Sequence, residues 1–279
     1  MDPIATHRRL SGRRALVTGA SRGIGAALAE RLAAEGADVA IVARTLDEGD
    51  AALTGSLTTT AEKLRRYGGN IAVIVADLAD EESRSTIVQR ATSMLGGHPD
   101  IVVNNAAAAK YLPLADFPLK RRRLLYEINV HAPLDIAQAA IPAMRAAGEG
   151  WIINVSSATA HHWPGPPFPL GSQGTTLTVY GSSKAALNRI TNGLGAELDG
   201  TGIRVNSIEP RAAVLSEGAT SLVGATLRPD QIESMEEMVE AALALCDCPV
   251  SMTGRICVSL DLIASLGLDV RALDGRALR

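Results

Sequence analysis

Residues 18–25 read TGASRGIG and lie between a short apolar run, Ala15 to Thr18, and an alanine-rich stretch, Ala26 to Ala34. Glycines at positions 19, 23 and 25 let the backbone turn sharply and approach a pyrophosphate, and the helix expected next offers unpaired N–H groups and a positive dipole end. The spacing differs from the G-x-G-x-x-G fingerprint. A tight connection that binds nothing is the alternative, but the position after the first strand favours a phosphate-binding turn.

Outward from this turn, short β-branched runs alternate with longer alanine- and leucine-rich segments, which predicts an α/β fold with a parallel sheet. The expected strands are nearly all apolar, as in sheets covered by helices on both faces, and they span residues 15–18, 39–42, 71–75, 101–103, 151–155, 204–208 and 255–260. The expected helices span residues 26–34, 61–67, 81–95, 119–147, 179–198 and 234–245. We expect one domain over residues 1–279, with an N-terminal arm (1–12) and a C-terminal tail (262–279).

Composition and charge argue against several classes of protein. The net charge of -3 gives no general attraction to nucleic acid or anionic membranes, and the basic run Lys120 to Arg123 is interpreted as a solvated helix face. The N-terminus lacks the apolar region of a signal peptide, and no stretch approaches the roughly 18 apolar residues of a membrane span. Three cysteines, Cys246, Cys248 and Cys257, fit neither a disulfide framework nor the usual zinc spacing. We expect a cytoplasmic protein with reduced thiols and no metal site.

A candidate proton-transfer pair lies in YGSSK, where Tyr180 and Lys184 are one helical turn apart. A tyrosine with a pKa of about 10 is a poor acid or base near neutrality, but a neighbouring ammonium lowers that pKa. This is the adjustment that general acid–base catalysis requires. Taken alone, the spacing is more typical of a surface helix pair.

Polar residues elsewhere strengthen the hypothesis. Ser157 follows the fifth expected strand in INVSS, and Asn104 and Asn105 end the fourth in VNNAA. Asn129 lies inside the long expected helix, where asparagine is unfavourable unless its amide has a partner. Each could be a cap or turn residue, but together they line one edge of the sheet.

With these residues, the chain resembles the short-chain dehydrogenase/reductase family from about Gly12 to Leu260, near its hydroxysteroid-dehydrogenase-like or 3-oxoacyl reductase branches. TGASRGIG, NNAA, INVHA, INVSS and YGSSK occur in the family's order. The resemblance implies a doubly wound Rossmann sheet of strand order 3-2-1-4-5-6-7 and a homodimer or homotetramer. It also implies hydride transfer between a nicotinamide and a small-molecule carbonyl or alcohol.

The resemblance assigns roles to individual residues. Tyr180 would be the general acid or base, and Lys184 would lower the Tyr180 pKa and hold the nicotinamide ribose. Ser157 would bind the substrate oxygen. Asn129 would hold a water that connects Lys184 to solvent. The cofactor phosphates would be surrounded by Gly19, Ser21, Arg22, Gly23, Ile24 and Gly25. The adenine would lie by Asp77 and Leu78, the adjoining ribose by Asn105, and the nicotinamide by Ile208 and Pro210.

The second expected strand ends at Ala43, about where NAD enzymes carry an acid, and Arg44 follows. Arg44 and Arg22 together favour NADP(H) over NAD(H), because guanidinium groups suit a 2′-phosphate. The acidic residues Asp47, Glu48 and Asp50 follow closely and could weaken the positive field of these arginines.

The sequence departs from the family pattern at three places. Ala107 replaces the glycine of a turn, Arg211 follows Pro210 in the loop beside the expected nicotinamide, and the interval from Ser157 to Tyr180 is lengthened. Residues 158–178 and 210–229 are expected to form substrate-side loops. Their apolar residues, including Trp163, Phe168, Pro169, Leu170 and the stretch 212–227, indicate a bulky, largely apolar substrate. Alternatively, the insert packs against a neighbouring subunit.

His161, His162 and Trp163 invite a metal-binding or catalytic interpretation but are taken as loop residues. Two other functions stay open: an epimerase or dehydratase of the same fold, and a non-catalytic dinucleotide sensor.

Overall fold

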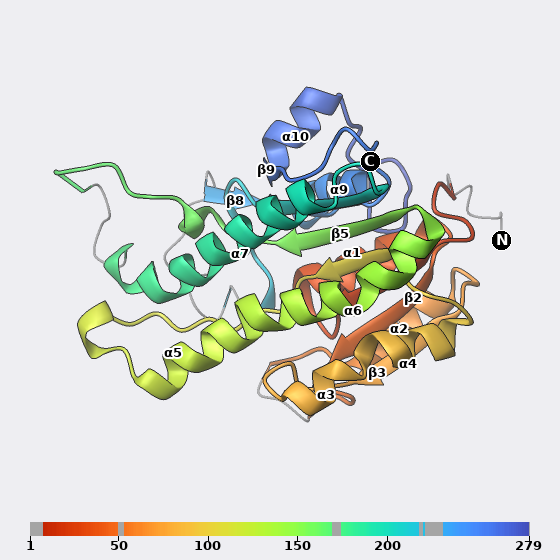
Figure 1. Cartoon of the computed structure of the whole chain (residues 1–279), viewed down its shortest axis with the longest axis horizontal. Helices are drawn as coiled ribbons and strands as arrows, with labels where there is room; N and C mark the ends of the chain where they lie inside the picture. The colour runs from red at the N-terminus through yellow and green to blue at the C-terminus, as the bar shows by residue number, and fades with distance from the viewer. Residues whose placement is uncertain (1–7, 50–52, 169–173, 218–219, 221–230, 279) are drawn as a thin grey trace.

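The structure is a computed structural model that describes residues 8–49, 53–168, 174–217, 220 and 231–278. Its centre is a parallel seven-stranded sheet of order β3-β2-β1-β4-β5-β6-β9, so the expected order 3-2-1-4-5-6-7 is confirmed (Figure 1). The strands are β1 (Arg14–Thr18), β2 (Asp38–Ala43), β3 (Ile71–Val75), β4 (Ile101–Asn104), β5 (Gly150–Val155), β6 (Ile203–Glu209) and β9 (Ile256–Val258). Two short strands, β7 (Ala213–Val214) and β8 (Ile232–Glu233), pair separately.

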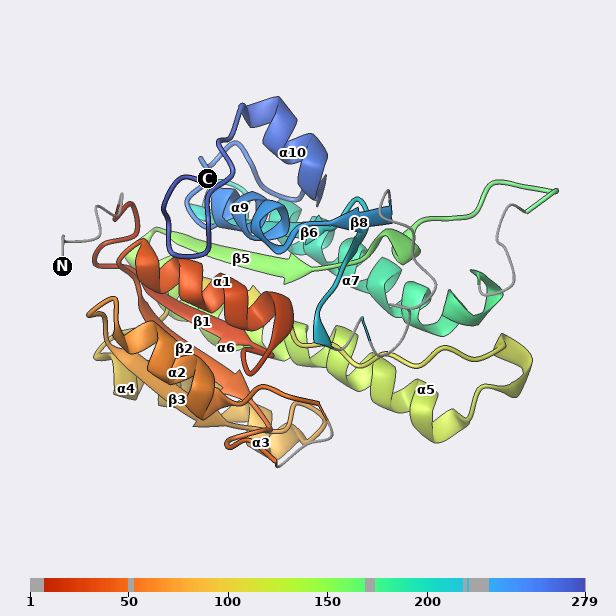
Figure 2. The same cartoon turned by 180° about the vertical axis from the view of Figure 1, so that it is seen from behind.

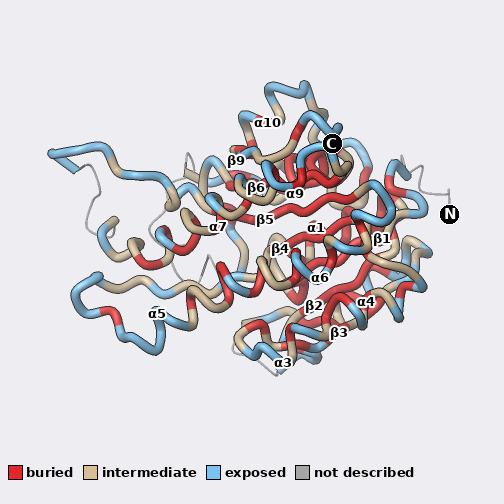
Figure 3. Tube along the Cα trace, in the orientation of Figure 1, coloured by how far each residue is buried: buried red, intermediate tan, exposed pale blue. Residues whose placement is uncertain are grey.

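Helices cover both faces of the sheet and bury it almost completely (Figure 3). One face packs against α1 (Gly23–Ala34), α2 (Leu57–Arg65) and α9 (Met235–Leu245), which lie together in Figure 2. The other packs against α4 (Ile87–Leu95), α6 (Ala132–Ala147) and the end of α7 (Thr178–Glu197). Burial on both sides explains why the strands show no apolar–polar alternation.

Two helices expected as continuous are interrupted. The stretch 81–95 is α3 (Glu81–Ser85), which Asp80 caps at its N-terminus, followed by α4; Thr86 separates the two helices with φ −90° and ψ −11°. The stretch 119–147 is α5 (Leu119–Tyr126), a π-helical turn η2 (Glu127–His131) and α6. The expected last strand, 255–260, was wrong at its end, since Ser259 already begins α10 (Ser259–Leu266).

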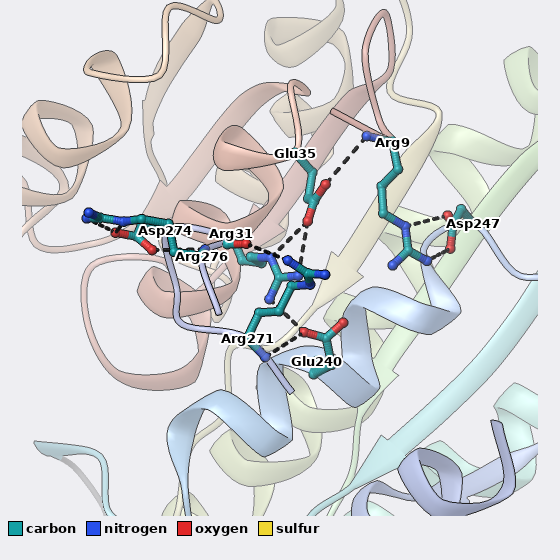
Figure 4. A network of polar contacts seen from close by, with 9 residues as sticks. Arg9, Arg31, Glu35, Glu240, Asp247, Arg271, Asp274 and Arg276 are labelled. Atoms are coloured by element: carbon teal, nitrogen blue, oxygen red, sulfur yellow. Dashed lines mark hydrogen bonds and ion pairs between the residues drawn. The ribbon is translucent and has the colours of Figure 1, made fainter. Parts of the chain in front are cut away.

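Buried charges hold the C-terminal segment against the body (Figure 4). Arg31 of α1 is 1% exposed and pairs with Glu35 at 3.0 Å and with Glu240 of α9 at 2.7 Å. Glu240 also accepts a hydrogen bond from the Arg271 backbone at 3.2 Å. The segment expected to be a tail therefore contains a helix and is anchored to α1 and α9 through ion-paired, buried side chains.

The first described part of the long insert, residues 158–168, begins with the short turn η3 (Ala158–Ala160). It then runs outward as an arm at the left of Figure 1. Phe168 on this arm is 58% exposed. The chain reaches α7 through the turn η4 (Gly174–Leu177), and Pro169 and Leu170 lie outside the described residues. None of the described helices combines the length and the apolar character needed to span a membrane.

Candidate active site

The glycine turn connects β1 to α1 at the carboxyl edge of the sheet. Gly19 has a φ of +67°, and a Cβ on Gly25 would lie 2.3 Å from Asn105 Nδ2 and 2.4 Å from the Gly19 carbonyl oxygen. Only glycine permits this close approach of turn and helix. The Asn105 amide donates to Thr18 O at 3.0 Å and to Gly19 O at 3.3 Å, so this side chain, expected at a ribose, braces the turn.

The N-terminus of α1 fits an anionic diphosphate. Its N-cap Arg22 is extended, and the Arg22 side chain makes no capping hydrogen bond. Uncapped first-turn N–H groups and the helix dipole favour a negative ligand. A cleft of about 720 Å³ adjoins Ser21 to Gly23 and is bounded by α1, α2, residues 53–55 and residues 215–217.

Arg22 has a different environment from the one expected. Its guanidinium donates to three backbone carbonyls of the loop before α2, Thr54 at 2.9 Å, Gly55 at 2.9 Å and Leu53 at 3.2 Å. Gly55 packs so tightly against the turn that a Cβ there would lie 2.6 Å from Ser21 O. Arg22 is therefore held by this loop, which was missed because contacts between distant loops leave no periodic signal.

Arg44 follows β2 and lies at the same edge, with its guanidinium 3.9 Å from Asp77 and its side chain 70% exposed. Asp77 accepts a hydrogen bond from the Ala79 backbone at 3.0 Å, and Leu78 beside it is buried. The acids feared to weaken this field turn toward α2: Asp47 accepts from Thr58 at 2.6 Å and Glu48 from Thr59 at 3.0 Å, while Asp50 lies outside the described residues.

Ser157, Tyr180 and Lys184 converge where β5 ends beside the first turns of α7. Ser157 lies beside the Tyr180 hydroxyl and acts to lower its pKa. Lys184 is 2% exposed, donates from Nζ to Val155 O at 2.7 Å and lies 5.8 Å from the Tyr180 ring centroid. Tyr111 packs edge-on against Tyr180, with ring centroids 6.0 Å apart.

The pKa values in this cluster correct one expectation. Burial raises the pKa of Tyr180 above its usual value, the nearby Tyr111 adds to the increase, and Ser157 opposes it. Burial lowers the pKa of Lys184 to about 8. The low Tyr180 pKa expected from Lys184 is absent from this structure, because desolvation disfavours the charged form of both groups.

Asn129 lies in the π-helical turn η2 and is fully buried. Its side-chain amide forms two hydrogen bonds with the backbone of Ala108: it accepts one from the N–H at 2.8 Å and donates one to the carbonyl at 2.9 Å. It also donates a hydrogen bond to the Ser183 hydroxyl at 2.9 Å. Ser183 precedes Lys184, so Asn129 links the loop after β4 to α7. Single π turns inside helices are frequent at functional sites.

A second amide network was missed by the sequence analysis. Asn104 donates to Asn154 at 2.9 Å, and Asn154 donates to Thr191 of α7 at 2.8 Å. These buried bonds tie β4, β5 and α7 together beneath Tyr180 and Lys184. An asparagine in the apolar strand GWIINV was the available signal.

At the expected nicotinamide wall, Ile208 is fully buried and Pro210 is half-buried. Between them, the carboxylate of Glu209 is 1% exposed and pairs with His161 Nε2. This pair was also missed, although a buried-strand pattern that ends in a carboxylate marked the position of Glu209.

The three cysteines are free and buried, and burial raises the pKa of Cys248 to about 11. The part of the chain that the structure describes contains no cluster of three or more potential metal ligands.

Comparisons with known proteins agree with this geometry. The sequence profile of the short chain dehydrogenase family matches residues 13–223. Hydroxysteroid dehydrogenase-like protein 2 of Mus musculus is 30% identical over 266 residues, which are 93% of this chain but 51% of the mouse protein. The chain therefore spans about half the length of that relative.

Solved structures are similar over most of both chains. A short chain dehydrogenase from Burkholderia cenocepacia in complex with NADP has a TM-score of 0.74 and 31% identity, covering 90% of this chain and 97% of its own. A 3-oxoacyl (acyl-carrier-protein) reductase from Agrobacterium tumefaciens with NADP bound has a TM-score of 0.75 and 26% identity, covering 90% and 94%. With the profile match and the convergent site, the chain belongs to the short-chain dehydrogenase/reductase family of NAD(P)-dependent oxidoreductases.

Proposed function

We propose that the protein transfers hydride between NADP(H) and a carbonyl compound or secondary alcohol, with Tyr180 as general acid or base. The observation that carries the proposal is the convergence of Tyr180, Ser157 and the buried Lys184 at the sheet edge that also holds the glycine turn. A bound nicotinamide would supply the hydride at its C4 atom.

The chain's own groups handle the proton. In reduction, the Tyr180 hydroxyl gives its proton to the substrate oxygen, while Ser157 donates a hydrogen bond to that oxygen and stabilises its developing negative charge. Lys184 holds the nicotinamide ribose and, when protonated, favours the tyrosinate together with the positive charge of an oxidised nicotinamide. We assign to Asn129 the water that connects Lys184 to solvent, and its position beside Ser183 supports that route.

A preference for NADP(H) is supported by Arg44, which is exposed after β2 while Asp47 and Glu48 bond to residues of α2. The NADP bound by the Burkholderia and Agrobacterium relatives is consistent with this preference. Because the Arg22 guanidinium is held by backbone carbonyls, Arg44 is the main candidate for the 2′-phosphate.

For the substrate we propose a bulky, largely apolar carbonyl compound, on the basis of the apolar residues in the two loops. Of these, Trp163 to Phe168 and Ala212 to Leu215 are described, and most of the stretch 212–227 lies outside the described residues. We further propose that residues 1–279 form one domain of a cytoplasmic protein that assembles as a homodimer or homotetramer.

Replacement of Tyr180 by phenylalanine tests the proposed chemistry, since it removes the transferable proton and little else. A panel of aldehydes and ketones, with phenanthrenequinone as the bulky apolar member, would be assayed by NADPH oxidation. The variant should lose roughly 10²-fold or more in turnover while binding NADPH within a few-fold of the wild type. Activity above about a tenth of the wild type would reject Tyr180 as the acid. Substrate conversion without net NADPH consumption would instead indicate an epimerase or dehydratase.

A further inference from the structure

We propose that His161, held by Glu209, is a positioning residue that fixes the turn carrying Ser157 against β6 and thereby keeps the Ser157 hydroxyl on Tyr180. The inference rests on the proposed function, because it concerns how the same acid–base pair is oriented. Neither residue belongs to the motifs that identify the family.

The location of Glu209 is set by strand alternation. Ser207, two residues earlier in β6, bonds Asn188 of α7 at 3.2 Å, so Glu209 points to the same side of the sheet. β6 pairs with β5, with Val155 opposite Ile208, which places Ser157 and Glu209 at neighbouring strand ends. Glu209 therefore lies on the catalytic side of the sheet edge.

The Ser157 turn is fixed by internal hydrogen bonding and by contacts with α7 and β6. Ser157 is the N-cap of η3, and its hydroxyl accepts from Thr159 Oγ1 at 2.9 Å. In the middle, the turn presses on α7 beside Tyr180: a Cβ on Gly181 would lie 2.3 Å from Thr159 O. At the far end, His161 leaves the turn and pairs with Glu209.

Burial of the Glu209 carboxylate makes this last attachment important. Glu209 is 1% exposed, and among the described residues its second carboxylate oxygen has no hydrogen-bond partner. A buried polar group without a hydrogen-bond partner is costly, and loss of His161 would remove the partner of the other carboxylate oxygen as well. Cys257 of β9 is a further titratable group that this carboxylate influences. The His161 side chain is 61% exposed, so replacing it removes the pair without opening a cavity.

The test measures the ionisation of Tyr180 directly and needs no substrate. With NADP⁺ bound, tyrosinate absorbance is titrated as the difference between each protein and the same protein carrying Tyr180→Phe, which cancels the other tyrosines. Loss of the Ser157 hydroxyl in Ser157→Ala should move the midpoint upward by roughly one pH unit. His161→Ala should move it in the same direction, and the double variant should move it no further. His161→Gln, which keeps a hydrogen-bond donor, should restore much of the difference.

His162→Ala is the matched control, because this neighbouring exposed histidine should leave the midpoint unchanged. A wild-type midpoint in His161→Ala, or shifts that add in the double variant, would overturn the positioning role while leaving the proposed function intact. An unchanged midpoint in Ser157→Ala would also overturn the positioning role, because Ser157 would then have no effect on Tyr180 to transmit. Only a Tyr180→Phe variant that kept its turnover would make the proposed function itself fail.

Discussion

Lys184 shows what one buried charge costs this protein. Its ammonium has one hydrogen-bond acceptor among the described residues, Val155 O, and burial lowers its pKa from 10.5 to about 8. Because the folded-state pKa lies below the unfolded one, the penalty is full below about pH 8 and disappears as pH rises through the window from about 8 to 10.5. Because a buried lysine ammonium costs stability at this site, its presence supports a catalytic role for Lys184 over a structural one.

We therefore predict that Lys184→Met raises the free energy of unfolding near neutral pH by about 2 kcal/mol, the pKa difference less one lost hydrogen bond. Urea unfolding at neutral pH and at about pH 10 measures this, and the gain should shrink at the higher pH. Lys120→Met, at an exposed position, is the control and should show no such trend. An equal gain at both pH values would argue against a charge penalty at Lys184.

Arg44 and Arg22 make contrasting predictions for the cofactor. Arg44→Ala should weaken NADPH binding by roughly 10-fold or more and change NADH binding little, because a charge-assisted bond to the 2′-phosphate is lost. Arg22→Ala should weaken both cofactors alike, since its guanidinium holds residues 53–55 against the glycine turn. Fluorescence titration of both cofactors separates the two roles. Equal losses of NADPH and NADH in Arg44→Ala would contradict the assignment.

At the scale of elements, the sequence predicted what depends on local pattern. Seven apolar strands and the glycine turn follow from periodicity and backbone chemistry, and both are present. The π turn at Asn129, the Arg22 contacts with residues 53–55 and the Glu209–His161 pair could not be predicted, because each depends on contacts between segments distant in the chain. The order of the strands came from family resemblance, since apolar runs do not specify their neighbours.

The glycine turn offers a test at this scale. Gly25→Ala would place a methyl group 2.3 Å from Asn105 Nδ2, so we expect a loss of roughly 1–3 kcal/mol of stability together with loss of cofactor binding. Gly193→Ala in α7 is the matched control, because no atom lies within 4 Å of the added Cβ, and helix propensity should make it neutral or stabilising. Thermal unfolding with and without NADPH measures both effects. A Gly25→Ala variant that bound NADPH normally would disprove the close-approach argument.

For the whole molecule, the unusual feature is the arm formed by residues 161–168, which extends away from the sheet beside the N-terminal end of α7 (Figure 1). Phe168 is 58% exposed in the single chain, and Trp163 is half-buried. Such apolar groups either cover a large substrate when the arm closes over the site or pack against a second subunit. The proposed apolar substrate requires the first arrangement.

Trp163→Ala and Phe168→Ala decide between these arrangements. If the arm binds substrate, both variants should raise the KM for phenanthrenequinone far more than the KM for a short ketone. The expected increase is roughly 10-fold for each large side chain removed. Both variants should keep the assembly state of the wild type. If the arm is an interface, they should instead elute later from a sizing column with the preference for large substrates unchanged. Val250→Ala, at an apolar position that is 61% exposed on the main body, controls for a general loss of surface hydrophobicity. Because the KM ratio reports the substrate and the elution volume reports the assembly, fully assembled variants with an unchanged ratio would reject both roles for the arm.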